Sequence, residues 1–300
     1  MAAIRLATRR SPLALVQARR VAELISLAQP GASIELIEVE SGGDRDLTTP
    51  ISQLGGVGVF AKEIQSAVLE GRADVAVHSA KDLPTEAIAG LRLAAVRERL
   101  DPADLLVGAT LDALPLGAKV ATGAPRRVAL LHAQRPDLEC VELRGNMAKR
   151  LSQVGRDGVV AVVAAAAALQ RLGLEVEAER LDPEQFVPQV GQGALALECR
   201  DDDAATLGLL AQIDNDLLHR ALRAERAFLA ALGSGCSVPA GCHAVARDGS
   251  VEAQGFLGAL DGSRSVRARA DGDVPEDVGR ALAESMLADP AAKGLEGVRP

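Results

Sequence analysis

The N-terminal residues 4–39, IRLATRRSPLALVQARRVAELISLAQPGASIELIEV, decide the fold. Ile4–Ala7 and Ile34–Val39 are short and apolar, which predicts two strands. Between them, Ser11 followed by Pro12 predicts the start of a helix, because serine caps helix N-termini and proline suits the first helical position. Apolar residues then recur at helical spacing until a Pro-Gly pair ends the helix. This strand–helix–strand unit indicates an α/β fold.

Strands and helices keep alternating as far as Cys199. Further strands are predicted at Asp74–Val77, Leu91–Val96, Lys119–Thr122, Leu138–Leu143, Val159–Val163 and Leu195–Cys199. Further helices are predicted at residues 60–68, Arg126–Gln134, Met147–Val154 and Ala164–Leu172. This rhythm predicts mainly parallel sheets with helices on both faces. A second unit begins near Asp104, Val187–Gly193 reads as a connection, and the last strand can return to the first sheet.

The pattern changes from Asp214 onward. Two helices are predicted at Leu217–Leu232 and Val274–Leu287. Between them, Val251–Leu260 and Ser263–Ala270 alternate and are joined by Asp-Gly, which is typical of a hairpin. The tail is therefore predicted to be a small α+β unit.

Composition excludes several classes of protein. Lys and Arg number 33 against 41 Asp and Glu, and the net charge of −8 argues against a nucleic-acid binder. The chain has no Trp, no Tyr and four Phe, too few aromatic rings for a base-stacking groove. Four Cys in 300 residues are too sparse for a disulfide scaffold, and we find neither an apolar signal core nor a long apolar run. We therefore expect a soluble protein of the reducing cytoplasm.

The segment Glu40–Val59 is rich in glycine and predicts a flexible cover over a site. Gly56–Ala61 within and beyond it matches G-x-G-x-x-A. A dinucleotide fingerprint follows a strand directly as a tight turn, whereas here a long loop separates the motif from Val39. A nucleotide-dependent oxidoreductase would rest on this match alone.

The stretch His78–Pro84, HSAKDLP, directly follows a predicted buried strand. The carboxyl ends of strands line the ligand crevice in open α/β sheets, so this stretch predicts a site. A solvated loop is the plain alternative. A Ser-His-Asp triad is disfavoured, because the nearby sequence lacks G-x-S-x-G.

Basic residues gather at turns that follow strands and open helices. They are Arg9, Arg10, Arg126, Arg127, Arg144, Lys149 and Arg150. Backbone N–H groups and the helix dipole add to side-chain cations at such places, and guanidinium binds carboxylate or phosphate with two prongs. An acidic protein with this arrangement is expected to bind a polyanionic small molecule; ordinary surface ion pairs are the alternative.

Cys236 lies in a glycine-rich turn, which is unusual for a structural cysteine. A metal site with Cys242 and His243 is disfavoured by the spacing and by the lack of a fourth ligand nearby. A free thiol without function is the other alternative. Cys140 and Cys199 lie in strand patterns and are predicted to belong to the core.

Five stretches together resemble the porphobilinogen deaminase family. They are LATRRSPLAL at 6–15, ADVAVHSAKDLP at 73–84, LRGN at 143–146, VGQGA at 190–194 and GCSVP at 235–239. They occur in the family's order and cover nearly the whole chain.

The resemblance implies two α/β lobes, similar to those of periplasmic binding proteins, around a cleft, with a small C-terminal α+β domain. Residues 1–97 with 193–212 would form the first lobe, 98–192 the second lobe and 213–300 the C-terminal domain, which carries the cofactor cysteine. A two-lobed binding module without chemistry is the alternative, against which the Cys236 turn and the lack of an export signal speak.

The resemblance also implies a transferase of porphyrin and heme biosynthesis. The family deaminates four porphobilinogen molecules and joins them head to tail into the linear tetrapyrrole hydroxymethylbilane. The primer is a dipyrromethane cofactor bound by a thioether, a role that maps to Cys236. The expected partner is the small-molecule substrate, without nucleic acid, membrane or metal, and the family favours a monomer.

The match assigns roles to individual residues. Asp82 is the catalytic aspartate, whose carboxylate can accept pyrrole N–H bonds, stabilise developing positive charge and help move a proton. The cofactor-binding residues are Cys236, Lys81, Asp44, Thr122, Arg126, Arg127, Arg144 and Gln192. The substrate-binding residues are Arg9, Ser11, Arg150 and Arg171. These cations would make the cleft locally positive despite the net negative charge.

Five positions depart from many relatives, which have Lys or Arg at the first three and serines at the last two. They are Gln53, Val57, Gly42, Gly123 and Ala124. We assign no side-chain contact to them, although the backbone N–H groups of Gly123 and Ala124 can still bind a carboxylate.

Overall fold

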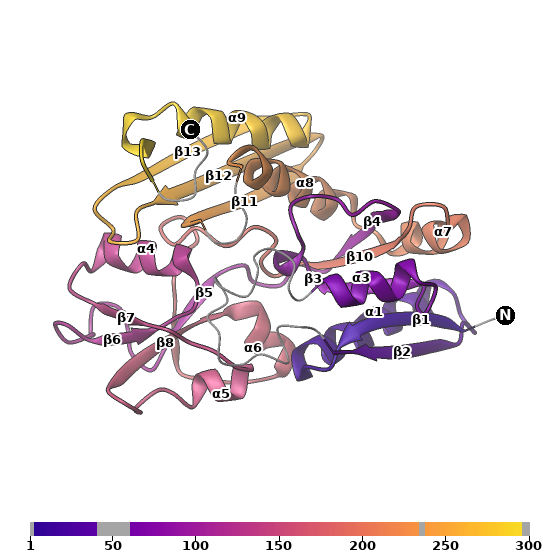
Figure 1. Ribbon diagram of the computed structural model, residues 1–300, viewed down its shortest axis with the longest axis horizontal. Coiled ribbons are helices and arrows are strands. Elements are labelled where there is room, and N and C mark those ends of the chain that lie inside the picture. The colour runs from indigo at the N-terminus through magenta and orange to yellow at the C-terminus, as the bar shows by residue number, and fades with distance from the viewer. Residues whose placement is uncertain (1–2, 41–60, 234–237, 296–300) are drawn as a thin grey trace.

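The computed structural model describes residues 3–40, 61–233 and 238–295, which form three sheets (Figure 1). The strand orders are β2-β1-β3-β10-β4, β7-β6-β8-β5-β9 and β11-β12-β13. In Figure 1 the first sheet lies on the right and the second at the lower left, with the third above them. The predicted α/β architecture with a smaller C-terminal α+β part is confirmed.

The first sheet combines strands from both ends of the α/β region. Its strands are β1 (Ile4–Arg9), β2 (Ile34–Val39), β3 (Val75–Ser79), β4 (Leu91–Arg97) and β10 (Leu195–Arg200). β1 pairs in parallel with β2 and β3, and β10 inserts antiparallel between β3 and β4. The prediction of a mainly parallel sheet, to which the last strand returns, is confirmed.

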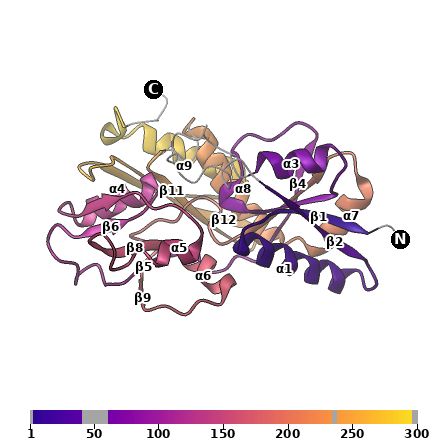
Figure 2. The ribbon, with the colours of Figure 1, turned by 60° about the horizontal axis from the view of Figure 1, so that its bottom comes forward.

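Helices cover both faces of the first sheet, as predicted. They are α1 (Pro12–Ala28), α3 (Lys62–Leu69) and α7 (Ala204–Ile213). Side chains alternate along each strand, so Leu6 packs against α1 and α7 while Ala7 packs against α3. Figure 2 shows α1 and α3 on opposite sides of β1. Because helices bury both faces of the sheet, polar side chains gather at the carboxyl ends of β1 and β3.

The second sheet repeats the pairing pattern of the first. Its elements are β5 (Asp104–Val107), β6 (Lys119–Ala121), α4 (Pro125–Gln134), β7 (Glu139–Val141), α5 (Met147–Leu151), β8 (Val159–Ala165), α6 (Ala166–Leu172) and β9 (Ala178–Arg180). β6 is parallel to β7 and β8, and β5 runs antiparallel between β8 and β9. In each sheet, the parallel strands are followed by one antiparallel strand, β10 in the first sheet and β5 in the second. The chain reaches each of these two strands directly from the other sheet.

Two segments carry the chain between these sheets, and they lie side by side. We call residues 98–103 and 187–194 the crossing segments. Leu100 N donates to Gly193 O at 3.1 Å, and Arg99 Nε donates to Gln192 O at 3.1 Å. The predicted connection at Val187–Gly193 is therefore one half of a hydrogen-bonded pair of crossings.

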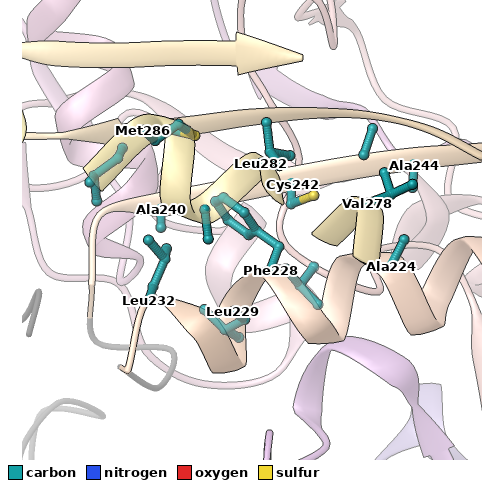
Figure 3. Close-up of a cluster of buried hydrophobic side chains, with 14 of the residues drawn as sticks. Ala224, Phe228, Leu229, Leu232, Ala240, Cys242, Ala244, Val278, Leu282 and Met286 are labelled. Carbon is teal, nitrogen blue, oxygen red and sulfur yellow. The ribbon is translucent and has the colours of Figure 1, made fainter. Parts of the chain in front are cut away.

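The C-terminal part packs two helices on one sheet. Its elements are α8 (Asp216–Ala231), β11 (Ala240–Arg247), β12 (Ser250–Gly258), β13 (Ser265–Gly272), α9 (Pro275–Leu287) and the short 3₁₀ helix η3 (Pro290–Ala292). Phe228, Leu282 and Met286 meet in its core, where Cys242 is also buried (Figure 3). The predicted hairpin is present as β12 and β13. Burial raises the pKa of Cys242, which behaves as a core residue.

The sequence analysis missed several elements, and some predicted segments lie outside the described residues. β5, β9, β11 and α7 were not predicted. Cys199 is buried and Cys140 half-buried, as expected of core residues. Residues 41–59 of the predicted cover, and with them most of the G-x-G-x-x-A motif, lie outside the described residues. Within the described ranges, no helix combines the length and apolar character needed to span a membrane.

Candidate active site

The carboxyl ends of β1 and β3 bring Arg9 and Asp82 together. β1 ends at Arg9, and β3 runs into the 3₁₀ turn η2 (Ala80–Asp82). Because the two strands are parallel neighbours, their ends meet at one edge, and Arg9 Nη1 lies 4.0 Å from Asp82 Oδ2. Both side chains keep partial exposure, at 20% and 31%. A solvent-reachable carboxylate beside a guanidinium is therefore present where the sequence predicts it.

A small pocket opens at this edge, lined by Arg9, Ser11 and Asp82 among others. Ser11 caps α1 through its hydroxyl, which accepts from Ala14 N. Gln17 and Ser79 also line the pocket, and their side chains exchange hydrogen bonds at 2.8 and 3.1 Å. The sequence prediction missed Gln17; the available signal was a polar residue on the buried face of an otherwise apolar helix.

The HSAKDLP stretch forms neither a solvated loop nor a triad. His78 is buried, and its Nε2 lies 3.1 Å from Glu198 Oε2. Ser79 points the other way along the strand and pairs with Gln17. The loop alternative is therefore wrong for His78. Among the described residues, His78 pairs with Glu198 and Ser79 with Gln17, and no hydrogen bond joins either of them to Asp82.

A second group of cations lies at the start of α4. Arg126 Nη2 and Arg127 Nη2 each donate to Asp104 at 2.6 Å, on different carboxylate oxygens. Burial alone raises the pKa of Asp104, but the two guanidinium groups outweigh burial and hold the pKa well below its usual range. Asp104 was not predicted as a site residue. Thr122, just before α4, is buried and accepts weakly from Ala124 N at 3.4 Å.

Lys81 and Gln192 connect the two groups. Lys81 Nζ donates to Gln192 Oε1 at 3.4 Å, and Gln192 belongs to a crossing segment. Burial, followed by the charge of Arg127, lowers the pKa of Lys81 from 10.5 to about 8, while Asp82 and Asp104 act in the opposite direction. Charged residues from both sheets therefore act on the pKa of the Lys81 ammonium group.

Arg150 belongs to the same cluster, and Arg144 contributes its charge. Arg150 Nε donates to Gly145 O at 2.7 Å, just before α5, the helix that Asn146 caps. Burial, together with the charges of Arg127, Arg144 and Arg9, lowers the pKa of Arg150 to about 10, with Asp82 opposing the shift. We call Arg9, Lys81, Arg127, Arg144 and Arg150, whose charges act on one another or on Asp82, the cationic cluster.

Arg171 lies at the crossing segments. Its Nη2 donates to Glu98 O at 3.1 Å and to Gly193 O at 2.7 Å. Burial lowers its pKa to about 10. The structure therefore gives Arg171 backbone partners on both crossings, in addition to the predicted substrate role.

Several of the remaining predicted positions fall outside the described residues. Asp44 and Cys236 lie outside the described residues, as do Gly42, Gln53 and Val57. A Cβ on Gly123 would lie 2.8 Å from Leu143 O, so a side chain there requires a shift of the backbone.

Two arginines outside the cationic cluster, both predicted to bind cofactor or substrate, keep a buried donor without a partner among the described residues. In the part of the chain that the structure describes, Arg126 Nε and Arg171 Nε are buried without a hydrogen-bond partner. Buried N–H groups of this kind normally find an acceptor. Within the same ranges, no three His, Cys, Asp or Glu side chains are placed to hold a metal ion. The donor set fits a carboxylate-rich organic group.

Comparison with known proteins gives a consistent result. Residues 4–208 match the family model described as porphobilinogen deaminase, dipyromethane cofactor binding domain, and residues 219–288 match its C-terminal domain. The porphobilinogen deaminase of Xanthomonas campestris pv. campestris (strain B100) is 44% identical, covering 98% of this chain and 99% of that protein. The porphobilinogen deaminase of Geobacter sulfurreducens is 44% identical, covering 95% and 92%.

Among solved structures the likeness is looser. A periplasmic aliphatic sulphonate binding protein from Escherichia coli is 18% identical with a TM-score of 0.39, covering 76% of this chain and 70% of that chain. A nutrient binding protein from Burkholderia cenocepacia is 16% identical with a TM-score of 0.41, covering 69% and 89%. The two family models and the identity over nearly the full length identify the family. The chain belongs to the porphobilinogen deaminase family.

Proposed function

We propose that this chain is a hydroxymethylbilane synthase, which deaminates four porphobilinogen molecules and joins them head to tail into a linear tetrapyrrole. Family membership over nearly the whole chain supports this reaction. The observation in the structure that carries the proposal is the cationic cluster around Asp82, built from both sheets. Each pyrrole ring of the substrate bears an acetate and a propionate, and such a cluster matches a growing polyacid.

Asp82 takes the catalytic role. Loss of ammonia leaves an electron-poor methylene-pyrrole, and the partly exposed Asp82 carboxylate stabilises that positive charge. The same oxygens accept pyrrole N–H bonds and help carry a proton to the leaving amine. Arg9 Nη1 lies 4.0 Å from Asp82 Oδ2, so a cation stands beside the catalytic carboxylate.

The family's dipyrromethane cofactor would be held by Cys236 through a thioether and by Lys81, Asp44, Thr122, Arg126, Arg127, Arg144 and Gln192. When bound, it supplies the pyrrole α-carbon from which the chain grows. The unpartnered Nε of Arg126 supports its place in this set. Arg9, Ser11, Arg150 and Arg171 would bind the incoming substrate, and the unpartnered Nε of Arg171 supports that role.

The domain limits are also a proposal. Residues 1–97 with 193–212 would form one lobe, 98–192 a second, and 213–300 the C-terminal domain. The packing of Leu209 and Leu210 with the first sheet supports placing residues 193–212 in the first lobe. We further propose a cytoplasmic monomer that acts on a small molecule. The net charge of −8 supports the exclusion of nucleic acid, and the family resemblance supports the rest.

Incubation of the purified chain with porphobilinogen tests the reaction. We expect release of ammonia and a linear tetrapyrrole, and an intact mass above that of the bare chain by one dipyrromethane. Cys236→Ser is expected to lose this added mass. Active protein with the mass of the bare chain would contradict the proposal, and a Cys236→Ser chain that keeps the adduct would move the attachment to another residue.

Asp82→Asn tests the catalytic assignment. The amide keeps the shape and loses the charge, so we expect the cofactor mass to remain and turnover to fall roughly 10²-fold or more. Single-turnover assays at saturating porphobilinogen measure this loss. Turnover close to that of the unmodified chain would remove Asp82 from the mechanism.

A further inference from the structure

Asp104 lies behind the cationic cluster and is fully buried, at 0% exposure. It begins β5, which pairs antiparallel with β8 and so brings Asp104 opposite Ala165. Besides the two guanidinium groups, the amide of Gln192 binds it, with Nε2 3.0 Å from Asp104 Oδ1. One carboxylate therefore fixes donors from α4 and from a crossing segment.

Asp104 also fixes which way the Gln192 amide faces. Gln192 Nε2 lies 2.7 Å from Pro102 O and 3.0 Å from Asp104 Oδ1, and both of these atoms only accept hydrogen bonds. The amide nitrogen must therefore face them, because the reverse orientation would set oxygen against oxygen. Gln192 Oε1 is consequently turned to Lys81 Nζ.

The carboxylate separates two buried like charges. Arg127 binds Asp104 through Nη2 at 2.6 Å and Nε at 3.2 Å, and its Nη1 donates to Val163 O at 3.0 Å. Arg126 divides its Nη groups between Asp104 and Val187 O. Both guanidinium forks are thus set before any ligand arrives.

We propose that Asp104 is a positioning residue for the deaminase reaction: its buried carboxylate presets Arg126, Arg127 and, through Gln192, Lys81 for the carboxylates of the pyrrole chain. The inference rests on the proposed function, since it takes those carboxylates as the ligand. Because Asp104 is fully buried, it acts through the side chains of Arg126, Arg127 and Gln192.

The ammonium group of Lys81 reports on this arrangement. The charged groups that act on it are Arg127 and Arg150, which disfavour its proton, and Asp82 and Asp104, which favour it. Removing the charge of Asp104 leaves the arginines less opposed, so the pKa of Lys81 must fall further below about 8.

Labelling of Lys81 by acetic anhydride across a pH series measures this without any turnover, because only the neutral amine reacts. In Asp104→Asn, whose side chain has nearly the same shape, we expect labelling of Lys81 near neutral pH to increase roughly three- to tenfold. Asp104→Glu keeps the charge and is expected to restore most of the original profile. Equal profiles in Asp104→Asn and the unmodified chain would overturn the proposal.

Asp74→Asn is the matched control. Asp74 also serves two arginines, with Arg5 Nη2 at 2.7 Å and Arg200 Nη2 at 3.8 Å, but it lies at the opposite end of the first sheet. We expect Asp104→Asn to raise KM for porphobilinogen at least tenfold with a smaller change in kcat, and Asp74→Asn to leave both within about twofold. Similar KM values for the two variants would assign Asp104 to stability alone.

A second variant covers the case in which Asp104→Asn does not fold. Asp104→Asn combined with Arg126→Met removes one charge of each sign and keeps Arg127, so the buried charge balance is preserved. The labelling of Lys81 is still expected to increase, and unchanged labelling would overturn the proposal. If the unmodified chain makes no tetrapyrrole, the proposed function fails, while the labelling series still decides whether Asp104 presets Lys81.

Discussion

Lys81 is the member of the cationic cluster whose charge varies near neutral pH. Its ammonium group has a pKa of about 8, whereas Arg150 stays protonated up to about 10. The protonated form predominates below about 8, and the charge is lost as the pH rises through that value. Since the protonated form binds carboxylate, affinity for an anionic substrate has to weaken on the alkaline side.

The expected result is a rise in KM on the order of tenfold between roughly pH 7 and pH 9. Lys81→Arg keeps a positive charge over this range, so it should flatten the alkaline rise. Lys81→Met should flatten it too, but with a high KM at every pH. Steady-state kinetics across the pH series measure the effect, and an unchanged rise in Lys81→Arg would assign it to another group.

At the scale of elements, the paired crossing segments determine how the two halves of the cluster meet. Gly193 has φ +89°, and a Cβ there would lie 2.5 Å from Leu100 O. Gly191 approaches the backbone at Lys81 just as closely, since its Cβ would lie 2.9 Å from Lys81 N. The crossings thus pack against η2, the turn that carries Asp82, without room for a side chain.

Gly193→Ala is expected to destabilise the fold by about 3 kcal/mol, because left-handed backbone strain and a backbone clash add together. Gly71→Ala is the matched control, because it shares the positive φ but would meet nothing within 4 Å. We expect about 1 kcal/mol for it. Urea unfolding of both variants measures the difference, and equal losses would show that the close approach to Leu100 is unimportant.

Prediction from sequence succeeded where the signal is local. Ile34–Val39 forms β2 with the predicted bounds, and Ser11 caps α1 as its sequence indicates. β11 was missed because its alanines, Gly241 and Cys242 favour no strand by themselves, and its place comes from pairing with β12. Asp104 was missed because only the long-range pairing of β5 with β8 brings it to α4.

For the site too, residues with a local sequence signal were predicted and links between distant residues were not. Motifs located Arg9, Lys81 and Asp82, because they lie directly after strands whose ends must meet. The hydrogen-bonded link from Lys81 through Gln192 to Asp104 joins residues far apart in the chain, and periodicity holds no information about it. The register of the two crossing segments, which decides that link, is a property of the folded chain.

At the scale of the whole molecule, Glu225 ties the C-terminal part to both crossings. It is fully buried on α8 and accepts from Arg99 Nη1 at 2.6 Å, Gly191 N at 2.7 Å and Ala244 N at 2.8 Å. One carboxylate therefore satisfies a crossing arginine, a crossing amide and an amide of β11. Its loss affects three parts of the fold at once.

Glu225→Gln is expected to lower the free energy of unfolding by about 3–5 kcal/mol, because Arg99 is left as a buried charge without its partner. Glu276→Gln, which breaks the exposed pair with Arg223, should change it by less than about 1 kcal/mol. Denaturant titrations of the full chain compare the two variants. Similar losses would show that the buried pair contributes no more than a surface pair.

The insertion of β10 between β3 and β4 has a consequence for biosynthesis. Among the described strands, β4 pairs only with β10, and β10 is translated after every strand of the second sheet. Until β10 has been synthesised, β3 and β4 have unpaired edges that can form incorrect pairings. All strands of the second sheet have been synthesised by then. The half of the molecule that is encoded in the middle is therefore the first that can be finished.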